Sequence, residues 1–198
     1  MSMSRCVALT NRHLVRGRLT DQIRLLVAGG IPSILLREKD LSQEEYADLA
    51  RAVIPLMSVP GDCILHHHID VARDLHHPAI HLPLPDLRRI WGDWLDFEIR
   101  GASVHSVSEA REAQDLGATY LMASPIFETA CKPGVLPKGT AFIGELVRLT
   151  GLPIYALGGI DPHNAQEALA AGATGVCLMS AAMGVDGDGV EDLRRFVR

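Results

Sequence analysis

Short apolar runs alternate with helix-like segments along the whole chain, and this alternation constrains the fold more than any other feature. The runs predict strands at Cys6–Thr10, Ser33–Leu36, Cys63–Leu65, Ala79–Leu82, Glu98–Ala102, Thr119–Ala123, Pro153–Leu157 and Gly175–Met179. The segments behind them predict helices, among them Leu19–Ala28, Gln43–Met57, Val107–Leu116, Ala141–Leu149, Pro162–Ala171 and Val190–Val197. Strands that alternate with such helices pair in parallel through right-handed crossovers. The eight runs therefore predict an α/β fold, a single (β/α)8 TIM barrel domain over residues 1–198.

Composition excludes several classes of protein. A net charge of −5 and a pI near 6.0 give no basic stripe, which argues against a nucleic-acid partner. No apolar stretch reaches the roughly 20 residues that span a bilayer. Met1–Arg5 leads directly into the first predicted strand, without the pattern of a signal peptide. We therefore expect a cytoplasmic protein without a membrane partner; a homo-oligomer is compatible with the sequence, which does not fix the oligomeric state.

Polar residues gather where the apolar runs end. In a TIM barrel the reacting groups lie where the strands meet the following loops. The chain carries at these places Arg37, Lys39, His66, Asp86, Ser103, Lys132, Gly158 and Ser180. The pattern therefore predicts an enzyme with its site at the carboxyl ends of the strands.

The last two strand ends predict a phosphate site. Gly158 and Gly159 follow the seventh run, and we expect Asp161 to cap the helix behind them. Glycines let backbone N–H groups approach an anion closely, so a side chain at Gly159 should impair binding while leaving the fold largely intact. Met179 and Ser180 end the eighth run and offer further N–H groups and a hydroxyl. The alternative is that the two glycines only make a tight turn.

Charged residues follow the second run directly. Arg37 and Lys39 are two positions apart, so on an extended backbone they face the same side. An arginine offers a planar fork to phosphate oxygens and a lysine offers a point charge, so the pair could hold a diphosphate. The alternative is that they form local ion pairs with Glu38 and Asp40.

Histidines follow the third run, at His66, His67 and His68. Such clusters suit zinc binding or acid–base catalysis. From an extended backbone only His66 and His68 share a side, and no carboxylate or cysteine completes a tetrahedral set. A single active-site histidine among the three is therefore favoured over a structural zinc.

Two more strand ends carry candidate residues. Asp86 could ligate Mg²⁺, or cap a helix that starts at Leu87, and both roles can hold together. Ser103 could donate to a phosphate or to a substrate. His105 could cap the helix that carries Glu109.

The longest irregular stretch is Phe127–Gly139, and its two lysines, Lys132 and Lys138, predict an anion-binding flap. The alternative is a plain surface connection. Cys131 lies in this polar stretch, where an exposed thiol is expected. The other cysteines fall inside apolar runs and are expected to be buried thiols: Cys6, Cys63 and Cys177.

In combination, these motifs resemble those of the thiamine-phosphate synthase family and of its sister family, the thiazole tautomerases. The resemblance covers nearly the whole chain and runs through Leu35–Asp40 (LLREKD), Ile80–Asp86 (IHLPLPD), Gly101–Ser106 (GASVHS), Pro125–Lys132 (PIFETACK), Ala156–Ile160 (ALGGI) and Gly175–Ala182 (GVCLMSAA). The synthase resemblance implies an enzyme that joins hydroxymethylpyrimidine diphosphate to a thiazole phosphate and releases diphosphate with the help of Mg²⁺. The pyrimidine would ionise to a carbocation that the thiazole nitrogen captures.

The resemblance also implies roles for single residues. Arg37, Lys39 and Lys132 would hold the diphosphate with help from Ser103, and Asp86 would bind Mg²⁺. The thiazole phosphate would be gripped by Thr129, Gly159, Met179 and Ser180.

Four positions depart from the synthase pattern. Leu35 stands where synthases carry Gln, His66 and His67 stand where they carry Asn-Asp, and Cys131 replaces the second Thr of their TxTK motif. The Asp replaced by His67 is normally a Mg²⁺ ligand, and histidine suits Mg²⁺ poorly. The resemblance therefore implies a weaker dependence on Mg²⁺.

Two alternatives accompany the synthase interpretation. A thiazole tautomerase shifts a proton without a metal, but its histidine base aligns with Pro125, so His66 or His67 would have to replace it. Lys39 and Asp86, which the synthase needs and the tautomerase does not, favour the synthase. The other alternative is a catalytically inactive regulatory homologue that binds phosphate ligands.

Overall fold

The structure is a computed structural model that describes residues 5–193 apart from 91, 130, 132, 133 and 188. Lys132, expected to hold the diphosphate, lies outside the described residues. The last four residues of the expected helix Val190–Val197 lie outside them as well.

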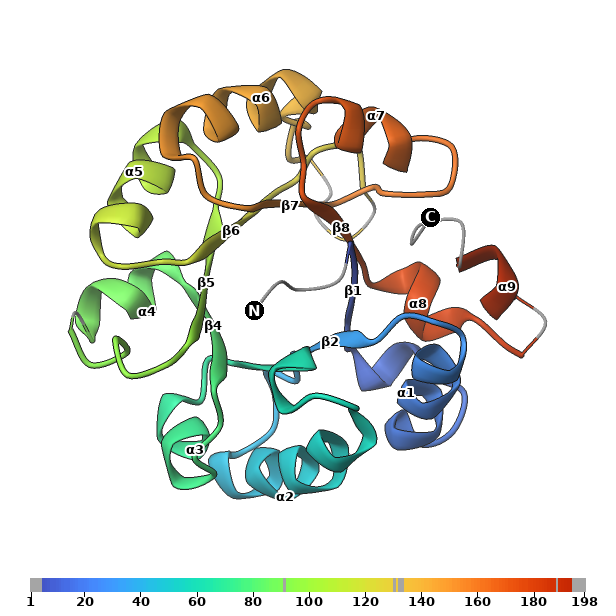
Figure 1. Ribbon diagram of the computed structural model, residues 1–198. Helices are drawn as coiled ribbons and strands as arrows, with labels where there is room; N and C mark the ends of the chain where they lie inside the picture. The colour runs from blue at the N-terminus through green and yellow to red at the C-terminus, as the bar shows by residue number, and fades with distance from the viewer. Residues whose placement is uncertain (1–4, 91, 130, 132–133, 188, 194–198) are drawn as a thin grey trace. The chain divides into compact units, whose positions relative to one another are not determined.

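Parallel strands form a closed barrel in which each strand lies beside the next along the chain (Figure 1). The strands are β1 Cys6–Leu9, β2 Ser33–Leu36, β3 Cys63–His66, β4 Ala79–Pro83, β5 Ile99–Val104, β6 Tyr120–Ala123, β7 Ile154–Leu157 and β8 Gly175–Leu178. The α-helices are α1 Leu19–Ala28, α2 Gln43–Val53, α3 Ile69–Asp74, α4 Leu84–Arg89, α5 Val107–Asp115, α6 Gly139–Thr150, α7 Ala165–Ala170, α8 Ser180–Gly184 and α9 Val190–Leu193. Short 3₁₀ helices span Arg12–Leu14, Ile54–Leu56 and Pro60–Asp62. The predicted (β/α)8 barrel is confirmed.

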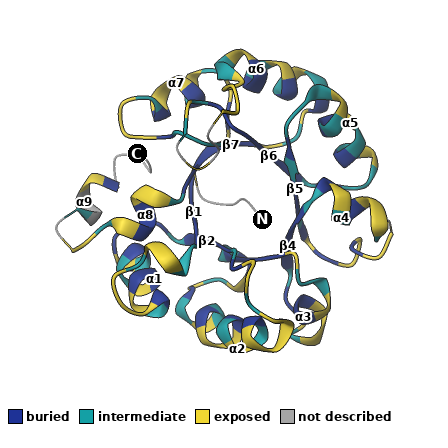
Figure 2. Cartoon of the chain, turned by 180° about the vertical axis from the view of Figure 1, so that it is seen from behind, coloured by how far each residue is buried: buried dark blue, intermediate teal, exposed yellow. Residues whose placement is uncertain are grey.

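The strands form the core of the fold. Every residue of β1, β2, β3, β6 and β8 is buried. Figure 2 shows the strands in the colour of buried residues, whereas the helices carry both buried and exposed positions. Continuous burial without alternation is typical of parallel strands that are covered on both faces.

Prolines and caps set the helix boundaries that periodicity alone misplaces. The expected helix Gln43–Met57 ends at Val53 and continues as a 3₁₀ turn, because Pro55 has no N–H to extend the α-helical ladder. Its start is well defined: Ser42 accepts from the N–H of Glu45, and the Glu45 carboxylate accepts from the N–H of Ser42. α6 ends at Thr150, and its C-cap residue Gly151 adopts the left-handed conformation.

The chain divides by its contacts into two compact units. The first comprises residues 1–80 and 178–198, and the second comprises residues 81–177. The single domain over residues 1–198 stays a prediction. None of the helices in the described ranges is long and apolar enough to cross a membrane.

Candidate active site

In the first unit, charged residues follow β2 directly. Arg37 is half-buried, and its backbone N–H donates to Thr10 Oγ1 at 2.8 Å, which ties the end of β2 to the end of β1. Lys39 is exposed, whereas Glu38 between them is only 3% exposed. The segment therefore places a buried carboxylate between a half-buried arginine and an exposed lysine.

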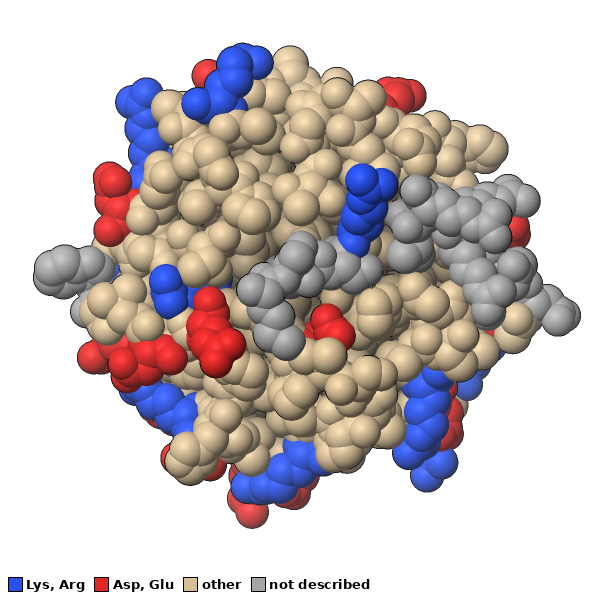
Figure 3. All heavy atoms as spheres, in the orientation of Figure 1, with Lys and Arg blue, Asp and Glu red and all other residues tan. Residues whose placement is uncertain are grey.

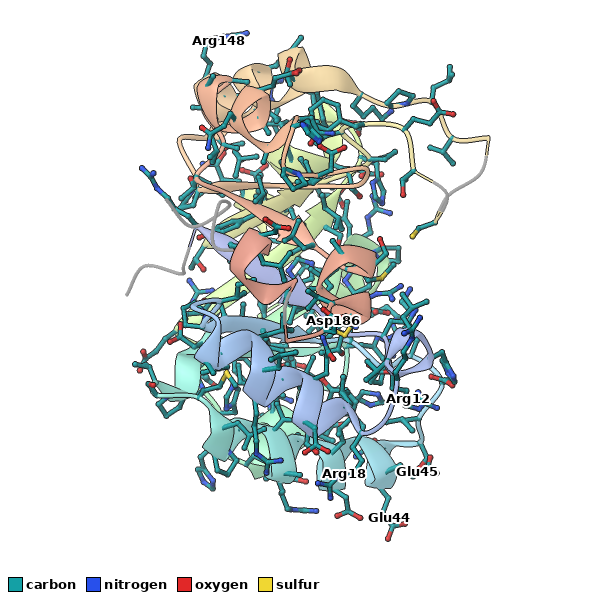
Figure 4. All side chains as sticks on the ribbon, turned by 90° about the vertical axis from the view of Figure 1, so that its right-hand side faces the viewer. Arg12, Arg18, Glu44, Glu45, Arg148 and Asp186 are labelled. Carbon is teal, nitrogen blue, oxygen red and sulfur yellow. The ribbon has the colours of Figure 1, made fainter. Side chains whose placement is uncertain are left out.

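The carboxylates of this segment are held by the loop after β1. Arg12, labelled in Figure 4, donates to Glu38 through its backbone N–H and its guanidinium, each at 3.1 Å. The same guanidinium donates to both Asp40 carboxylate oxygens, at 2.5 and 2.7 Å, and His13 Nε2 lies 2.9 Å from Asp40. The hydrogen bonds from Arg12, followed by that from His13, hold the pKa of Asp40 well below its usual value. Glu38 thus pairs with Arg12, and Asp40 pairs with both Arg12 and His13.

A buried tyrosine ties the ends of β2 and β3 together. The Tyr46 hydroxyl donates to the Leu36 carbonyl at 2.6 Å and accepts from the backbone N–H of His66 at 2.8 Å. Burial raises the pKa of Tyr46, so the hydroxyl stays protonated and can fill both roles. Because Leu36 precedes Arg37 in the chain, this bridge fixes the backbone next to both candidate segments.

The expected histidine cluster forms a tight turn. His66 is 5% exposed, whereas the His67 side chain is exposed and its φ is +69°, a conformation that non-glycine residues rarely adopt. The His68 ring lies 4.3 Å from the Tyr46 ring between centroids, and burial, with a smaller effect of His67, lowers the pKa of His68. Backbone strain of this kind concentrates at functional sites.

Met179 and Ser180 lie at the start of α8. Met179 is the N-cap residue, and Ser180 is the exposed first residue of the helix. No side chain caps this end. Within the described part of the chain, the N-cap side chain thus leaves the first N–H groups of the helix without a capping bond.

In the second unit, Asp86 lies in the first turn of α4. The N-cap of this helix is Pro83 and the helix starts at Leu84, so the expected cap role of Asp86 before Leu87 is wrong. Pro85 explains the earlier start, because its fixed φ suits the first turn of a helix. The half-buried Asp86 carboxylate accepts from Arg89 at 3.0 Å.

Ser103 belongs to a chain of hydrogen bonds that crosses three strands. Its hydroxyl lies 2.8 Å from His81 Nε2, and His81 Nδ1 lies 2.9 Å from the Tyr120 hydroxyl. His81 is 1% exposed and comes from β4, while Tyr120 opens β6. Neither residue was predicted to belong to the site, although a histidine inside the apolar run Ala79–Leu82 was a visible signal.

Ser106, not His105, caps the helix after β5. The Ser106 hydroxyl accepts from the N–H of Glu109 at 3.2 Å, so the expected role of His105 is wrong. A serine oxygen reaches this N–H more readily than an imidazole does. His105 instead donates through Nδ1 to the Ser124 carbonyl oxygen at 2.7 Å, while its backbone N–H donates to the Glu109 carboxylate at 2.6 Å.

The two glycines after β7 are required by close packing. Their φ values are +97° at Gly158 and +66° at Gly159. A Cβ at Gly159 would lie 2.2 Å from the Glu128 carbonyl oxygen, and one at Gly158 would lie 2.9 Å from Pro125 Cα. The expectation that a side chain at Gly159 leaves the fold largely intact is therefore wrong, because the backbone of the neighbouring segment occupies that space.

Asp161 stabilises a turn rather than capping α7. The N-cap of α7 is Asn164, and the helix starts three residues later than expected. Asp161 Oδ1 accepts from the N–H of Asn164 at 3.0 Å, and Asn164 Oδ1 accepts from the N–H of Asp161 at 2.9 Å. The Asn164 amide also donates to the Gly159 carbonyl at 2.7 Å, which orients the peptide after the glycine pair.

The stretch Phe127–Gly139 carries the remaining candidates. Thr129 Oγ1 accepts from the N–H of Cys131 at 3.3 Å, and Cys131 is exposed as expected. Lys138 is the N-cap of α6, and its backbone N–H donates to the Pro125 carbonyl at 2.8 Å. The flap role of this stretch stays a prediction. The other cysteines are buried as expected: Cys6, Cys63 and Cys177.

On the face shown in Figure 3, basic and acidic side chains are scattered among uncharged atoms. Of the described residues, no group of three His, Cys, Asp or Glu side chains is arranged to hold a metal ion. The candidate sites thus consist of single charged side chains, backbone N–H groups and one buried hydrogen-bond chain.

Comparison with known proteins decides the family. The model of the family described as thiamine monophosphate synthase matches residues 6–182. The chain belongs to this family. A curated thiamine-phosphate synthase of Halalkalibacterium halodurans is 38% identical over 168 residues, which cover 81% of this chain and 78% of that protein. One from Shouchella clausii is 34% identical over 188 residues, which cover 91% and 88%.

A solved structure described as thiamine phosphate pyrophosphorylase from Pyrococcus furiosus is also similar. It matches with a TM-score of 0.83 and 27% identity, and the match covers 98% of this chain and 95% of that one. A similarly described structure from Bacteroides thetaiotaomicron matches at 17% identity with a TM-score of 0.68, which shows the shared fold alone.

Proposed function

We propose that the chain is a transferase of thiamine biosynthesis, which joins hydroxymethylpyrimidine diphosphate to a thiazole phosphate and releases diphosphate. The observation that carries this proposal is the identity of 38% and 34% to two curated thiamine-phosphate synthases over most of the chain. Its substrates would be small phosphorylated molecules and its location the cytoplasm. The homo-oligomer stays a prediction.

The bond that breaks joins the pyrimidine methylene carbon to the diphosphate oxygen, and both bonding electrons leave with the diphosphate. The thiazole nitrogen then donates its lone pair to the resulting carbocation. Because the leaving group gathers negative charge, fixed cations beside it stabilise the transition state more than the substrate. Arg37 and Lys39 would supply these cations from the end of β2, and Lys132 would add a third.

The cations of the first unit are well suited to this role, because the nearby acids are engaged elsewhere. Glu38 and Asp40 bond to Arg12 and His13, which reduces the competition of these carboxylates for Arg37 and Lys39.

The thiazole phosphate would be held by hydroxyl and backbone N–H groups. Met179 and Ser180 open a helix without a side-chain cap, and such N–H groups favour an anion. Gly158 and Gly159 adopt positive φ values, which turn the backbone sharply after β7. Thr129 would add a hydroxyl.

Asp86 is the candidate Mg²⁺ ligand. Its carboxylate suits a hard cation, although the ion would compete with the Arg89 guanidinium that bonds to it. The donor set fits only if water and diphosphate oxygens complete the shell, which Mg²⁺ commonly accepts. Bound Mg²⁺ would neutralise charge on the departing diphosphate. With His67 at a position where the family carries a carboxylate, weaker Mg²⁺ dependence is expected.

One assay tests the proposal. Purified protein, Mg²⁺, hydroxymethylpyrimidine diphosphate and thiazole phosphate are combined, and thiamine phosphate is measured with time. Its steady formation is the expected result. Aromatisation of a thiazole tautomer alone, lost in His66→Ala or His67→Ala, would establish the tautomerase instead. No turnover on either substrate set would favour the inactive regulatory homologue.

A further inference from the structure

The buried chain Tyr120–His81–Ser103 links an interior hydroxyl to one at the end of a strand. Tyr120 is 2% exposed and His81 is 1% exposed, whereas Ser103 is only half-buried. Ser103 is the second-last residue of β5, and the carboxyl ends of barrel strands carry the reacting groups. The chain therefore connects a buried hydrogen bond to a group that a ligand can reach.

The hydrogen of the Tyr120 hydroxyl decides the state of the imidazole. Burial raises the pKa of Tyr120 well above its usual value, so the phenol keeps its proton. Among the described residues, His81 Nδ1 is the only hydrogen-bond partner of this hydroxyl. A buried O–H without an acceptor is costly, so the phenol donates and Nδ1 accepts.

The direction of the second bond follows from the first. With Nδ1 as the acceptor, a neutral imidazole carries its hydrogen on Nε2. That N–H donates to Ser103 Oγ across 2.8 Å. The serine oxygen is then already an acceptor, and its own hydrogen is directed to a different partner.

We propose that Tyr120 and His81 are positioning residues that fix the Ser103 hydroxyl as a donor to a phosphate oxygen of the substrate. This inference rests on the proposed function for the identity of the anion. In the opposite tautomer, the Ser103 hydroxyl would donate its hydrogen to Nε2, and the serine would offer an anion only its lone pairs. The tautomer thus decides whether Ser103 attracts or repels a diphosphate oxygen.

Gly101 shows that the fold keeps space for this arrangement. Gly101 lies two residues before Ser103 on β5 and pairs in register with Tyr120 on β6. A Cβ at this position would lie 2.3 Å from both His81 Nδ1 and the Tyr120 hydroxyl, in the path of their hydrogen bond. Only glycine lets the phenol reach from β6 across β5 to the imidazole on β4.

The first measurement reads the tautomer directly. Nitrogen-15 NMR of the ring nitrogens, assigned by comparison with His81→Asn, should show a neutral His81 with its hydrogen on Nε2 in the unliganded wild-type protein. Tyr120→Phe removes the donor to Nδ1, so signals of the other tautomer should appear. A wild-type His81 with its hydrogen on Nδ1 would overturn the proposal, whatever the enzyme does.

The second measurement tests the consequence for binding, with inorganic diphosphate as the probe in calorimetry. Loss of one hydrogen bond to a charged ligand should weaken binding about tenfold in Ser103→Ala. Tyr120→Phe should weaken it about threefold, yet add nothing in the Ser103→Ala background, since it acts through that serine. Tyr155→Phe is the matched control, because it removes a second buried phenol hydroxyl whose ring packs edge-on against Tyr120, at 5.6 Å between centroids.

The outcomes separate the inference from the proposed function. Thiamine phosphate formation together with an unaltered diphosphate affinity in Tyr120→Phe would support the proposed function. It would overturn the proposal that Tyr120 and His81 position the Ser103 hydroxyl. An Nε2–H tautomer with the expected affinity losses, but without thiamine phosphate formation, would support the positioning role of Tyr120 and His81 and refute the proposed function. Equal losses from Tyr120→Phe with and without Ser103 would mean that Tyr120 acts on packing alone, and would also overturn the proposal.

Discussion

The ends of β2 and β3 and the ends of β5 to β7 position their polar groups by different means. In the first region, charged side chains such as Arg12 and Asp40 meet near the surface, where both are partly exposed. In the second region, neutral groups lie in van der Waals contact with backbone, as at Gly101 and Gly159. Substitutions in the first region should therefore lower the reaction rate with little change in stability. Substitutions in the second region should lower stability with little change in rate.

Removal of a cation from the first region should have the largest effect. Arg37→Ala should lower kcat/KM about 10²–10³-fold, because one preorganised electrostatic contact is lost from the transition state. The free energy of unfolding should change by less than about 1 kcal/mol, as for most substitutions outside the core. Steady-state kinetics and urea unfolding measure the two quantities.

Arg51→Ala is the matched control for this prediction. Arg51 lies on α2, is exposed, and pairs with Asp48 three residues away. Its removal should leave both rate and stability unchanged. A comparable loss of rate in the two variants would contradict the role assigned to Arg37.

In the second region, a single methyl group should destabilise the fold. Gly159→Ala should lower the free energy of unfolding by about 2–4 kcal/mol, because a strained φ adds to a clash with backbone that cannot move aside. Gly151→Ala provides the matched control: its φ is +64° against +66°, but nothing lies within 4 Å of its added Cβ. Gly151→Ala should lower the free energy of unfolding by only about 1 kcal/mol, because it adds backbone strain without a clash.

Equal losses in the two glycine variants would show that conformation alone matters at Gly159. The comparison between the regions would then fail, since packing against the Glu128 carbonyl would contribute nothing. Chemical denaturation at one pH and temperature is sufficient to distinguish the two results.

Glu38 is the buried exception within the first region. Glu38→Gln should lower the free energy of unfolding by about 1–3 kcal/mol, because its carboxylate accepts from the backbone and the guanidinium of Arg12. Asp48→Asn, which alters an exposed ion pair, should have no measurable effect. Thermal unfolding of the two variants compares a buried and an exposed acid; equal behaviour would contradict the importance of burial.

The fold was largely predictable from the sequence. Runs such as Ser33–Leu36 are apolar throughout because both faces of the strand are covered, so their bounds stand out. Short helices were harder to find: α4 holds six residues and contains Pro85, which is too little for a helical period to appear. The expected cap at Asp86 failed for the same reason.

The position of Arg37 and Lys39 at a strand end was also predictable, because they interrupt an apolar pattern; their role in the site stays a prediction. The buried hydrogen bonds of His81 were not predictable. His81 and Tyr120 are 39 positions apart, and only the register of β5 against β6 brings the phenol over Gly101. A sequence shows where a charge is out of place, but a buried hydrogen bond depends on strand pairing that local pattern does not reveal.

The smallest expected effect concerns acid stability in the first region. The hydrogen bonds from Arg12, and then from His13, depress the pKa of Asp40 in the folded state below its ordinary value of 3.8. The unfolded chain therefore binds protons at higher pH than the folded chain does. The resulting stabilisation is complete above the ordinary pKa and is lost as the pH falls through the lower folded value.

Asp40→Asn removes this titration, so its stability should lie slightly below that of the wild type at pH 6 and meet it as the pH falls below the folded pKa of Asp40. Because Asp40 is exposed, salt should screen the pair, and the difference at pH 6 should shrink on adding about 1 M NaCl, where the Debye length is about 3 Å. Urea unfolding at several pH values, with and without salt, measures the difference. A gap that widened toward acid pH would reverse the sign of the linkage, and would show that Asp40 is not stabilised by Arg12 in the folded protein.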